Sequence, residues 1–407
     1  MPTLLNGAIL VAALGYFVDV YDLILFSVVR VQSLKELGVP TEGLLDTGVL
    51  LLNSQMVGML LGGILWGIWG DKKGRLSVLF GSIFLYSAAN IANGFATNVP
   101  TYAILRFLAG IGLAGELGAG ITLVSEILPK EKRGYGTTIV ATVGVMGAVF
   151  AALIAESFHW RTSYFVGGAM GLALLALRIS VKESPIYKSI ELKSKVKKGD
   201  LLMIFKSKER FARYVKCILT GLPIWFVLGV FITFAPEFGQ AFGMTTPVKS
   251  GDAVLYVYIG LVVGDLSSGL LSQFLKSRRK AIAIFLAITW ISTLAFLYLL
   301  KGHPPKMLYL MCLPLGFGVG YWAVFITAAA EQFGTNLRAT VTTSVPNLVR
   351  GAAVPITMSF RSLSHGSGVI TASLIVGSTC FLLAFYALWH SSESFHADLD
   401  FVEEHFA

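Results

Sequence analysis

The amino-acid sequence predicts an all-α integral membrane protein of twelve spanning helices, arranged as two six-helix bundles. Three observations support this prediction: the composition, the recurrence of long apolar runs, and a repeat that relates the two halves of the chain. Of the 407 residues, 55% are hydrophobic and only 14% are charged, whereas an average soluble domain has roughly 25% charged residues. A chain of this composition has too few polar side chains to cover a surface that faces water.

Apolar runs long enough to cross a hydrocarbon core of roughly 30 Å recur along the whole chain. The first run, Leu4 to Val31, is too long for the core of a signal peptide and lacks the basic segment that precedes one, so we interpret it as a spanning helix. We expect twelve spans, at roughly 5–30, 46–69, 76–96, 101–127, 135–157, 161–180, 210–236, 252–274, 280–300, 306–329, 339–360 and 366–390.

The loops between these runs differ in charge. An even number of spans places both termini on one side of the membrane, and Lys and Arg concentrate in the loops of that side. Because cytoplasmic loops are rich in these residues, the termini are predicted to be cytoplasmic, with the protein in the inner (cytoplasmic) membrane. The formal charge of +9 then reflects topology and not a nucleic-acid partner. The residues are Lys72, Lys73, Arg75, Lys130, Lys132, Arg133, Lys276, Arg278, Arg279, Lys280 and Arg338.

The longest connection, about Val181 to Arg210, is dense in lysine and falls midway along the chain. We expect it to lie along the anionic cytoplasmic surface of the bilayer. It divides the chain into a first bundle (1–180), a basic linker (181–209) and a second bundle with a short cytoplasmic tail (210–407). Because one chain contains both bundles, we expect a monomer to suffice.

The two halves also repeat one another. A Val-Gly pair, a later Gly and two basic residues occur in 57–73 and again in 263–279, a shift of 206 residues. A glutamate and an arginine seven residues apart follow the fourth run and recur after the tenth, at a shift of 205: Glu126 and Arg133, then Glu331 and Arg338. Two matches at nearly one offset indicate a duplicated bundle, with a pathway between the two copies.

The loop after the second run, Gly70-Asp71-Lys72-Lys73-Gly74-Arg75, resembles the signature G-D-[RK]-x-G-R of the major facilitator superfamily. Glu126 followed seven residues later by Arg133-Gly134 is similar to a second signature of that family. The segment from Arg106 to Glu116, and Glu183-Ser184-Pro185, look like its metabolite:proton symporter, aromatic-acid and niacin, and organic-anion branches. The resemblance implies the twelve-helix fold of that family and gradient-driven transport by alternating access.

Charged residues inside the spans are candidate functional groups, because each is costly there unless it is paired or faces water. Asp19 and Asp22 are three residues apart and share a face of the first span. Counting residues places Asp22 and Arg106 at a similar depth. The resemblance implies that Asp22 and Arg106 form a proton-coupling pair, with Asp19 and Glu116 as further proton carriers; a static ion pair that fixes helix packing is the alternative.

Arg350 lies in the apolar eleventh run, beside Asn347. A guanidinium presents a planar fork of donors that suits a carboxylate or phosphate, so Arg350 is the candidate anion-binding residue. The pattern around it is similar to that of organic anion transporters. The alternative is an internal ion pair, with Asp265 as the partner.

Other candidates are assigned by residue type. Small-molecule sites are mostly apolar with a few placed polar groups, so we add Trp225, Tyr256, Tyr321, Gln55 and Asn347 as substrate contacts, although packing or lipid contact is the alternative for each. A gating network at the cytoplasmic helix ends is predicted at Asp71, Arg75, Glu126, Arg133, Glu331 and Arg338. In the second half Ser277 occupies the position of Asp71, a departure from the signature.

The sequence gives no sign of an enzyme. It has no HExxH, GxSxG or P-loop pattern, and its three cysteines have no CxxC spacing, so we expect no catalytic residues, metal or cofactor. We expect proton-coupled symport of a small organic anion, a carboxylate, with the lipid bilayer as the other partner. The alternatives are a carrier of inorganic phosphate or a sugar, an exporter or facilitator without proton coupling, a membrane enzyme, or a transport-derived sensor.

Overall fold

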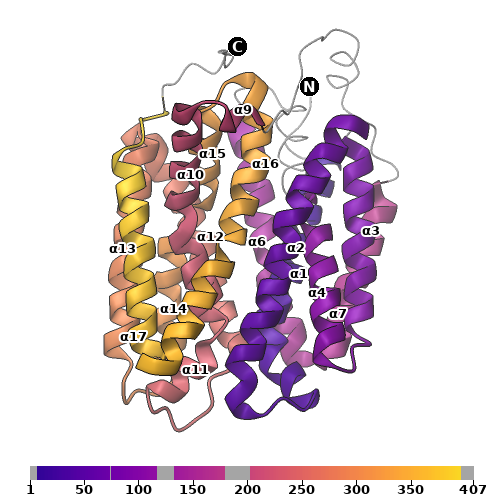
Figure 1. Ribbon diagram of the computed structural model, residues 1–407, viewed down its shortest axis with the longest axis vertical. Coiled ribbons are helices and arrows are strands. Elements are labelled where there is room, and N and C mark those ends of the chain that lie inside the picture. Colours follow the sequence, from indigo (N-terminus) through magenta and orange to yellow (C-terminus); the bar gives the residue numbers. More distant parts are fainter. Residues whose placement is uncertain (1–6, 74, 117–132, 179–201, 396–407) are drawn as a thin grey trace.

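The computed structural model describes residues 7–73, 75–116, 133–178 and 202–395. Every regular element within these ranges is a helix, and the helices form two bundles that stand side by side (Figure 1). The predicted all-α fold is therefore confirmed. The start of α1 (Gly7) and the end of α17 (Trp389) lie at one end of the molecule, which we call the terminal end; the opposite end is called the distal end.

The first bundle contains six long helices. Successive helices run in opposite directions, and short connections such as the 3-10 turn η1 (Thr41–Gly43) join them. The bounds are α1 (Gly7–Glu36), α2 (Leu44–Lys73), α3 (Arg75–Asn93), α4 (Val99–Leu113), α6 (Arg133–Ser157) and α7 (Trp160–Arg178).

The second bundle repeats this plan with more interruptions. After the short α9 (Leu202–Phe205), its elements are α10 (Lys208–Phe226), η3 (Val227–Ile232), α11 (Ala235–Ala241), α12 (Ser250–Leu275), α13 (Arg278–Leu299), α14 (Pro305–Val319), α15 (Trp322–Glu331), α16 (Thr335–Gly351) and α17 (Ala353–Trp389). Gly368 has φ 77° and ψ 161°, so α17 reverses there and supplies the end of the eleventh span and all of the twelfth.

The outer surface of the bundles is apolar. Phe84, Leu270 and Phe274 are 60%, 73% and 84% exposed, and eight helical stretches in the described ranges are long and apolar enough to cross a membrane. Exposed side chains of this kind are compatible with lipid and not with water. The chain is a multipass membrane protein.

Three spans of the second bundle are interrupted within their length. The seventh passes through Pro223 into the π-helical η3, the tenth breaks between α14 and α15, and the eleventh breaks between α16 and α17. A break leaves backbone groups without helical partners, and in a membrane these must be satisfied inside the protein. Broken spans therefore place polar backbone and side chains at the interface between the bundles.

Glycines permit the closest helix contacts, in the same places in both halves. A Cβ on Gly110 would lie 2.1 Å from the Gln55 carbonyl oxygen, and one on Gly316 would lie 1.9 Å from the Val257 carbonyl oxygen. These glycines stand 206 residues apart. The contacts of α2 with α4 and of α12 with α14 are therefore equivalent, which is the structural form of the repeat.

Gly110→Ala should destabilise the protein, because its new methyl group meets α2 backbone that cannot move aside. Overpacking of this kind costs about 1–3 kcal/mol, so the apparent Tm in detergent should fall. Gly269→Ala is the matched control, since a Cβ there meets nothing within 4 Å. An equal loss of Tm in both variants would contradict the packing argument.

Candidate functional site

A buried ion pair joins the two bundles at their centre. Arg350 of α16 and Asp19 of α1 are 2% and 0% exposed, and Arg350 Nη2 lies 3.7 Å from Asp19 Oδ2. The distance is longer than a hydrogen bond, so the contact is electrostatic and loose. The sequence analysis offered Asp265 as the internal partner of Arg350; the structure pairs Arg350 with Asp19 instead.

The guanidinium of Arg350 keeps unused hydrogen-bonding capacity. Its Nε and Nη1 atoms have no hydrogen-bond partner among the described residues, and neither do the two carboxyl oxygens of Asp19. Buried charged groups are normally hydrogen-bonded as well as paired. The pair is thus incompletely satisfied at the position where the two bundles meet.

Asp265, the alternative partner considered for Arg350, hydrogen-bonds to the backbone of α15. Its Oδ1 accepts a hydrogen bond from the backbone N–H of Ala323 at 3.1 Å. Ala323 lies in the first turn of α15, so the carboxyl group of Asp265 satisfies an amide that the break in the tenth span leaves without a helical partner. This contact fixes Trp322 at the start of α15.

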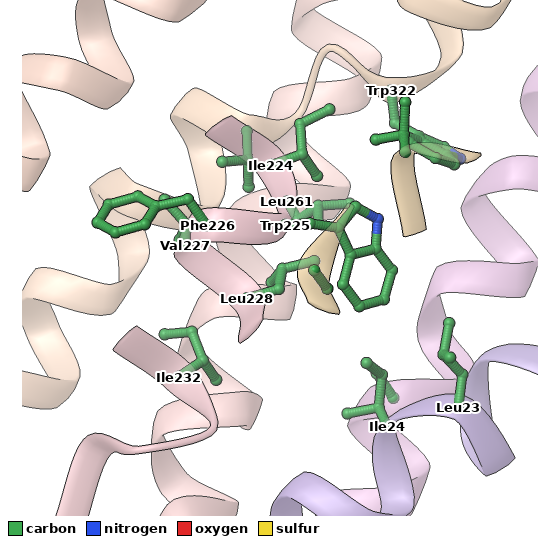
Figure 2. Close-up of a cluster of buried hydrophobic side chains, with 14 of the residues drawn as sticks. Leu23, Ile24, Ile224, Trp225, Phe226, Val227, Leu228, Ile232, Leu261 and Trp322 are labelled. Carbon is green, nitrogen blue, oxygen red and sulfur yellow. The ribbon is translucent and has the colours of Figure 1, made fainter. Parts of the chain in front are cut away.

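Aromatic side chains enclose the ion pair. The ring of Trp322 lies 6.0 Å from Arg350 Cζ, and the phenol of Tyr16 lies against Trp322 and within electrostatic range of Arg350 and Asp19. Trp225 points from α10 toward Leu23 and Ile24 of the first bundle (Figure 2). The centre therefore offers one cation with free donors inside an aromatic and apolar wall.

Asp22 and Arg106, the predicted proton-coupling pair, do not form an ion pair in the structure. Arg106 donates instead to Gln55 Oε1 and, at 3.5 Å, to the Tyr164 hydroxyl, and its Cζ lies 4.9 Å from the Phe26 ring. Counting residues gave their depth but not the direction of the side chains. Gln55, predicted to contact substrate, accepts a hydrogen bond from Arg106 in the structure.

Glu116 also has a partner that the sequence analysis missed. It forms a buried ion pair with Arg178 at the end of α7. A Cβ on Gly15 would lie 2.2 Å from Glu116 Oε1 and 2.4 Å from Arg178 Nη2. The pair therefore rests on the backbone of α1, one turn from Asp19.

The remaining predicted substrate residues lie at varying distances from the ion pair. Asn347 is at the bundle interface, where its Nδ2 donates to the Ala114 carbonyl at 3.2 Å. Tyr321 donates to the Thr220 carbonyl at 3.0 Å inside the second bundle. The Tyr256 ring packs on Tyr309, with centroids 6.0 Å apart. Of the three, only Asn347 bridges the bundles through a hydrogen bond that the structure describes.

The distal end carries a second junction between the bundles. Arg30 of α1, fully buried, pairs with Glu237 of α11 at 2.6 Å and donates to the carbonyls of Thr233 at 3.2 Å and Leu44 at 3.0 Å. Ser27 and Thr233 share a hydroxyl hydrogen bond of 2.9 Å. The predicted first span ends at residue 30, and the sequence analysis assigns Arg30 no role; a charged residue at the end of an apolar run is the signal that could have indicated this junction.

Further polar contacts close the distal end. Arg361 Nε and His365 Nε2 lie 2.7 Å and 3.0 Å from Asp46 Oδ1, and Thr357 donates to Asn53 Oδ1 at 2.7 Å. All of these join α2 to α17. The bundles are therefore held together at their distal end as well as at the centre.

The predicted gating residues are described only in part. Glu331 pairs with Arg278 at 3.1 Å and accepts a hydrogen bond from Ser394 at 2.8 Å. Asp71 lies in the last turn of α2, and Arg75, Arg133 and Arg338 lie in the first turns of α3, α6 and α16; their side chains, and all of Glu126, lie outside the described residues.

The chain segment after α17 contributes a carboxylate to this network. Glu393 accepts hydrogen bonds from the Ser277 hydroxyl and, at 2.9 Å, from the backbone N–H of Arg278. Burial raises the pKa of Glu393, but these hydrogen bonds outweigh it, so the pKa lies below its ordinary value. Ser277 stands at the position that Asp71 has in the first half. Glu393 therefore supplies a negative charge next to a position where the second half lacks one.

The fold and the site define a class of protein: a multipass membrane transporter of two duplicated bundles, with a charged centre between them. The model of the Major Facilitator Superfamily matches residues 12–356, so the chain belongs to that family. It is a transporter and not an enzyme.

Curated relatives cover nearly the whole chain. The chain is 27% identical to "Putative niacin/nicotinamide transporter NiaP" of Bacillus subtilis (strain 168), over 92% of this chain and 94% of the relative. It is 24% identical to "Gentisate transporter" of Corynebacterium glutamicum, over 93% and 86%. A crystal structure of a D-xylose-proton symporter shares the fold, with a TM-score of 0.73 at 17% identity, over 98% of this chain and 100% of that one.

Glu237→Ala should weaken the distal junction strongly, because it leaves the buried Arg30 without its carboxylate. Breaking a buried pair costs about 3–5 kcal/mol, so a cysteine placed at the distal interface should label faster. Glu156→Ala is the control: Glu156 and Lys249 also lie on opposite bundles, but 3.9 Å apart and 60% and 70% exposed, where a pair contributes at most about 1 kcal/mol. Equal labelling in both variants would show that the Arg30–Glu237 pair does not hold the distal ends of the bundles together.

Proposed function

We propose that this protein imports a small organic anion, a monocarboxylate, together with a proton. The observation that supports this proposal is the Arg350–Asp19 pair. It places a cation with free donors beside a carboxyl group at the bundle interface, near mid-membrane. A substrate carboxylate and Asp19 are competing partners for the same guanidinium.

This competition couples the proton to the substrate. When Asp19 is ionised, it neutralises the charge of Arg350, so Arg350 stabilises a bound substrate anion only weakly. When Asp19 is protonated, Arg350 is an uncompensated buried cation, which a carboxylate stabilises through charge-assisted hydrogen bonds. The anion thus binds best to the form of the protein that carries the proton, and both cross the membrane together. Asp22, also buried without a hydrogen-bond partner among the described residues, is a further proton carrier.

The surroundings of Arg350 favour a ring-bearing acid over a sugar. Trp322, Tyr16 and Trp225 offer aromatic faces, and Leu23 and Ile24 add apolar surface, whereas a sugar needs many hydrogen-bonding groups. The names of the relatives agree: niacin and gentisate each carry a carboxylate on an aromatic ring. Nicotinate and hydroxybenzoates are the substrates to test first.

The two bundles, 1–180 and 210–407 with the linker 181–209 between them, rock about this site as a monomer in the inner membrane. The termini are cytoplasmic, which makes the distal end the outer one. The junctions at Arg30 and Asp46 then close the outer gate, while the residues around Asp71 and Glu331 with their arginines form the cytoplasmic gate.

Arg350→Ala should strongly reduce proton-driven uptake of labelled nicotinate or benzoate into proteoliposomes at low substrate concentration. Each lost charge-assisted hydrogen bond costs about 1.5–3 kcal/mol, which raises the half-saturation concentration from about tenfold to more than a hundredfold. Arg350→Lys keeps the charge without the fork and should retain intermediate affinity. Asp19→Asn should bind substrate without a proton, so that exchange persists while a pH gradient no longer drives accumulation.

Xylose and inorganic phosphate are the comparison substrates. Gradient-driven sugar uptake that survives Arg350→Ala would refute the anion assignment. Uptake of a carboxylate that is equal with and without a proton gradient would refute symport and leave a facilitator.

A further inference from the structure

A group of polar side chains is buried inside the first bundle, away from the interface with the second. Asp22 on α1 and Tyr86, Ser87, Asn90 and Asn93 on α3 are all 0% exposed. Eight of their side-chain oxygen and nitrogen atoms, including both Asp22 carboxyl oxygens, have no hydrogen-bond partner in the described part of the chain. We call these five residues the polar column.

The members of the polar column lie along one seam. Tyr86, Asn90 and Asn93 are spaced to share a face of α3, and Asn90 lies beside the Asp22 carboxyl group. Helix α7 borders the seam with glycines: a Cβ on Gly167 would lie 2.3 Å from Asp22 Oδ1, and one on Gly171 would lie 2.1 Å from Ser87 Oγ.

Packing does not require an acid or asparagines here, because the second bundle has apolar residues at three of the five positions. At the offset of 206 residues, Phe296, Leu299 and Leu228 stand where the first bundle has Asn90, Asn93 and Asp22, and Phe296 is fully buried. Ser292 and Thr293 occupy the positions of Tyr86 and Ser87. The carboxyl and amide groups are therefore particular to the first copy of the fold, and the second copy keeps only small hydroxyl side chains.

The polar column runs between two groups of charged residues, one at the distal end of the first bundle and one next to Asp19. At the distal end, Asn93 precedes Gly94 and Ala96, whose carbonyls accept from Arg161 at 3.0 Å and 2.7 Å. Arg161 lies 3.3 Å from Glu36, which is also bound by His159. At its inner end, the Tyr86 phenol lies within electrostatic range of Asp19, Glu116 and Arg178.

Charged groups face the column from each helix around it. Asp19 comes from the same helix as Asp22, Arg106 comes from α4, Glu116 lies three residues beyond the end of α4, and Arg178 comes from α7. Arg106 and Asp22 interact electrostatically without direct contact. The seam is thus polar enough for water, since buried water binds where several otherwise unsatisfied polar groups converge.

We propose that the polar column is a water-bridged proton path that leads from the distal face through Asn93, Asn90 and Asp22 to Asp19. Protons then enter inside the first bundle, while the anion enters between the bundles. Water molecules joined by the asparagine, serine and tyrosine groups pass a proton to the Asp22 carboxylate and from there to Asp19; the asparagines orient the water and carry no charge themselves. This inference rests on the proton-coupled function proposed above.

The test compares Asn90→Leu with Thr293→Val in proteoliposomes. Leucine has the same branched heavy-atom skeleton as asparagine but no hydrogen-bonding groups, and Thr293 is the buried hydroxyl of the second bundle at the position of Ser87. Two rates are measured in each variant: proton-gradient-driven uptake of labelled nicotinate or benzoate, and exchange of that substrate across the membrane without a gradient.

Asn90→Leu should lower gradient-driven uptake at least tenfold and leave exchange within about twofold of the unaltered protein, because exchange needs no net proton entry. Thr293→Val should leave both rates unchanged. Loss of both rates in Asn90→Leu would indicate a structural role, and full retention of both would overturn the path. If the unaltered protein shows exchange but no gradient-driven uptake, the proposed symport itself fails, which is a different result.

Thiol labelling tests the water directly and does not depend on transport. Cysteines at positions 93, 90 and 87, introduced as Asn93→Cys, Asn90→Cys and Ser87→Cys, should react with a small hydrophilic thiosulfonate added from the distal side, the first of them fastest. The three native cysteines are buried, and Thr293→Cys is the control at the equivalent position of the second bundle. No faster reaction at position 90 than at position 293 would overturn the proposal.

Discussion

The rest of the structure depends on one interaction, the ion pair of Asp19 and Arg350 across the two bundles. An isolated charge at this depth costs several kcal/mol, so neither residue is stable here without a partner. The surrounding helices are built to hold the two charges together. Breaks in the spans of the second bundle place Trp322 beside Arg350. Asp265 accepts a hydrogen bond from the backbone N–H of Ala323 in the first turn of α15.

The duplicated fold assigns different chemistry to its two halves. The glycine contacts that set helix spacing are shared at one offset, as Gly110 and Gly316 illustrate. The polar residues are not shared: Trp225 and Leu228 stand where the first bundle has Asp19 and Asp22. At the central site, the first half therefore supplies the acid Asp19, and the second half supplies Arg350 with Trp225 and Trp322. Substrate binding and proton binding meet only where the halves meet, which makes each depend on the other.

The helices were predictable from the sequence because a spanning segment must be long, apolar and internally hydrogen-bonded. The partners inside the bundles were not. Counting residues placed Asp22 and Arg106 at one depth, but it does not give the orientation of each helix about its axis. In the structure Arg106 faces Gln55, and Arg350 pairs with Asp19. Arg178 and Arg30 were missed as partners of Glu116 and Glu237, because pairing between distant spans leaves no periodic signal. Glu393 is a further case: the sequence shows that Ser277 lacks a charge, but only the fold shows what supplies it.

Helix α1 links the central pair to the distal junction, because it carries both Asp19 and Arg30. These residues are eleven positions apart, about 16 Å along a helix, and both bind the second bundle. Replacing Asp19 by a substrate at Arg350 releases α1 at the centre but leaves Arg30 bound to Glu237 and to the Thr233 carbonyl. Substrate binding alone therefore cannot separate the bundles at the distal end. Opening of the distal end therefore requires release of the Arg30 junction in addition to any change at the central pair.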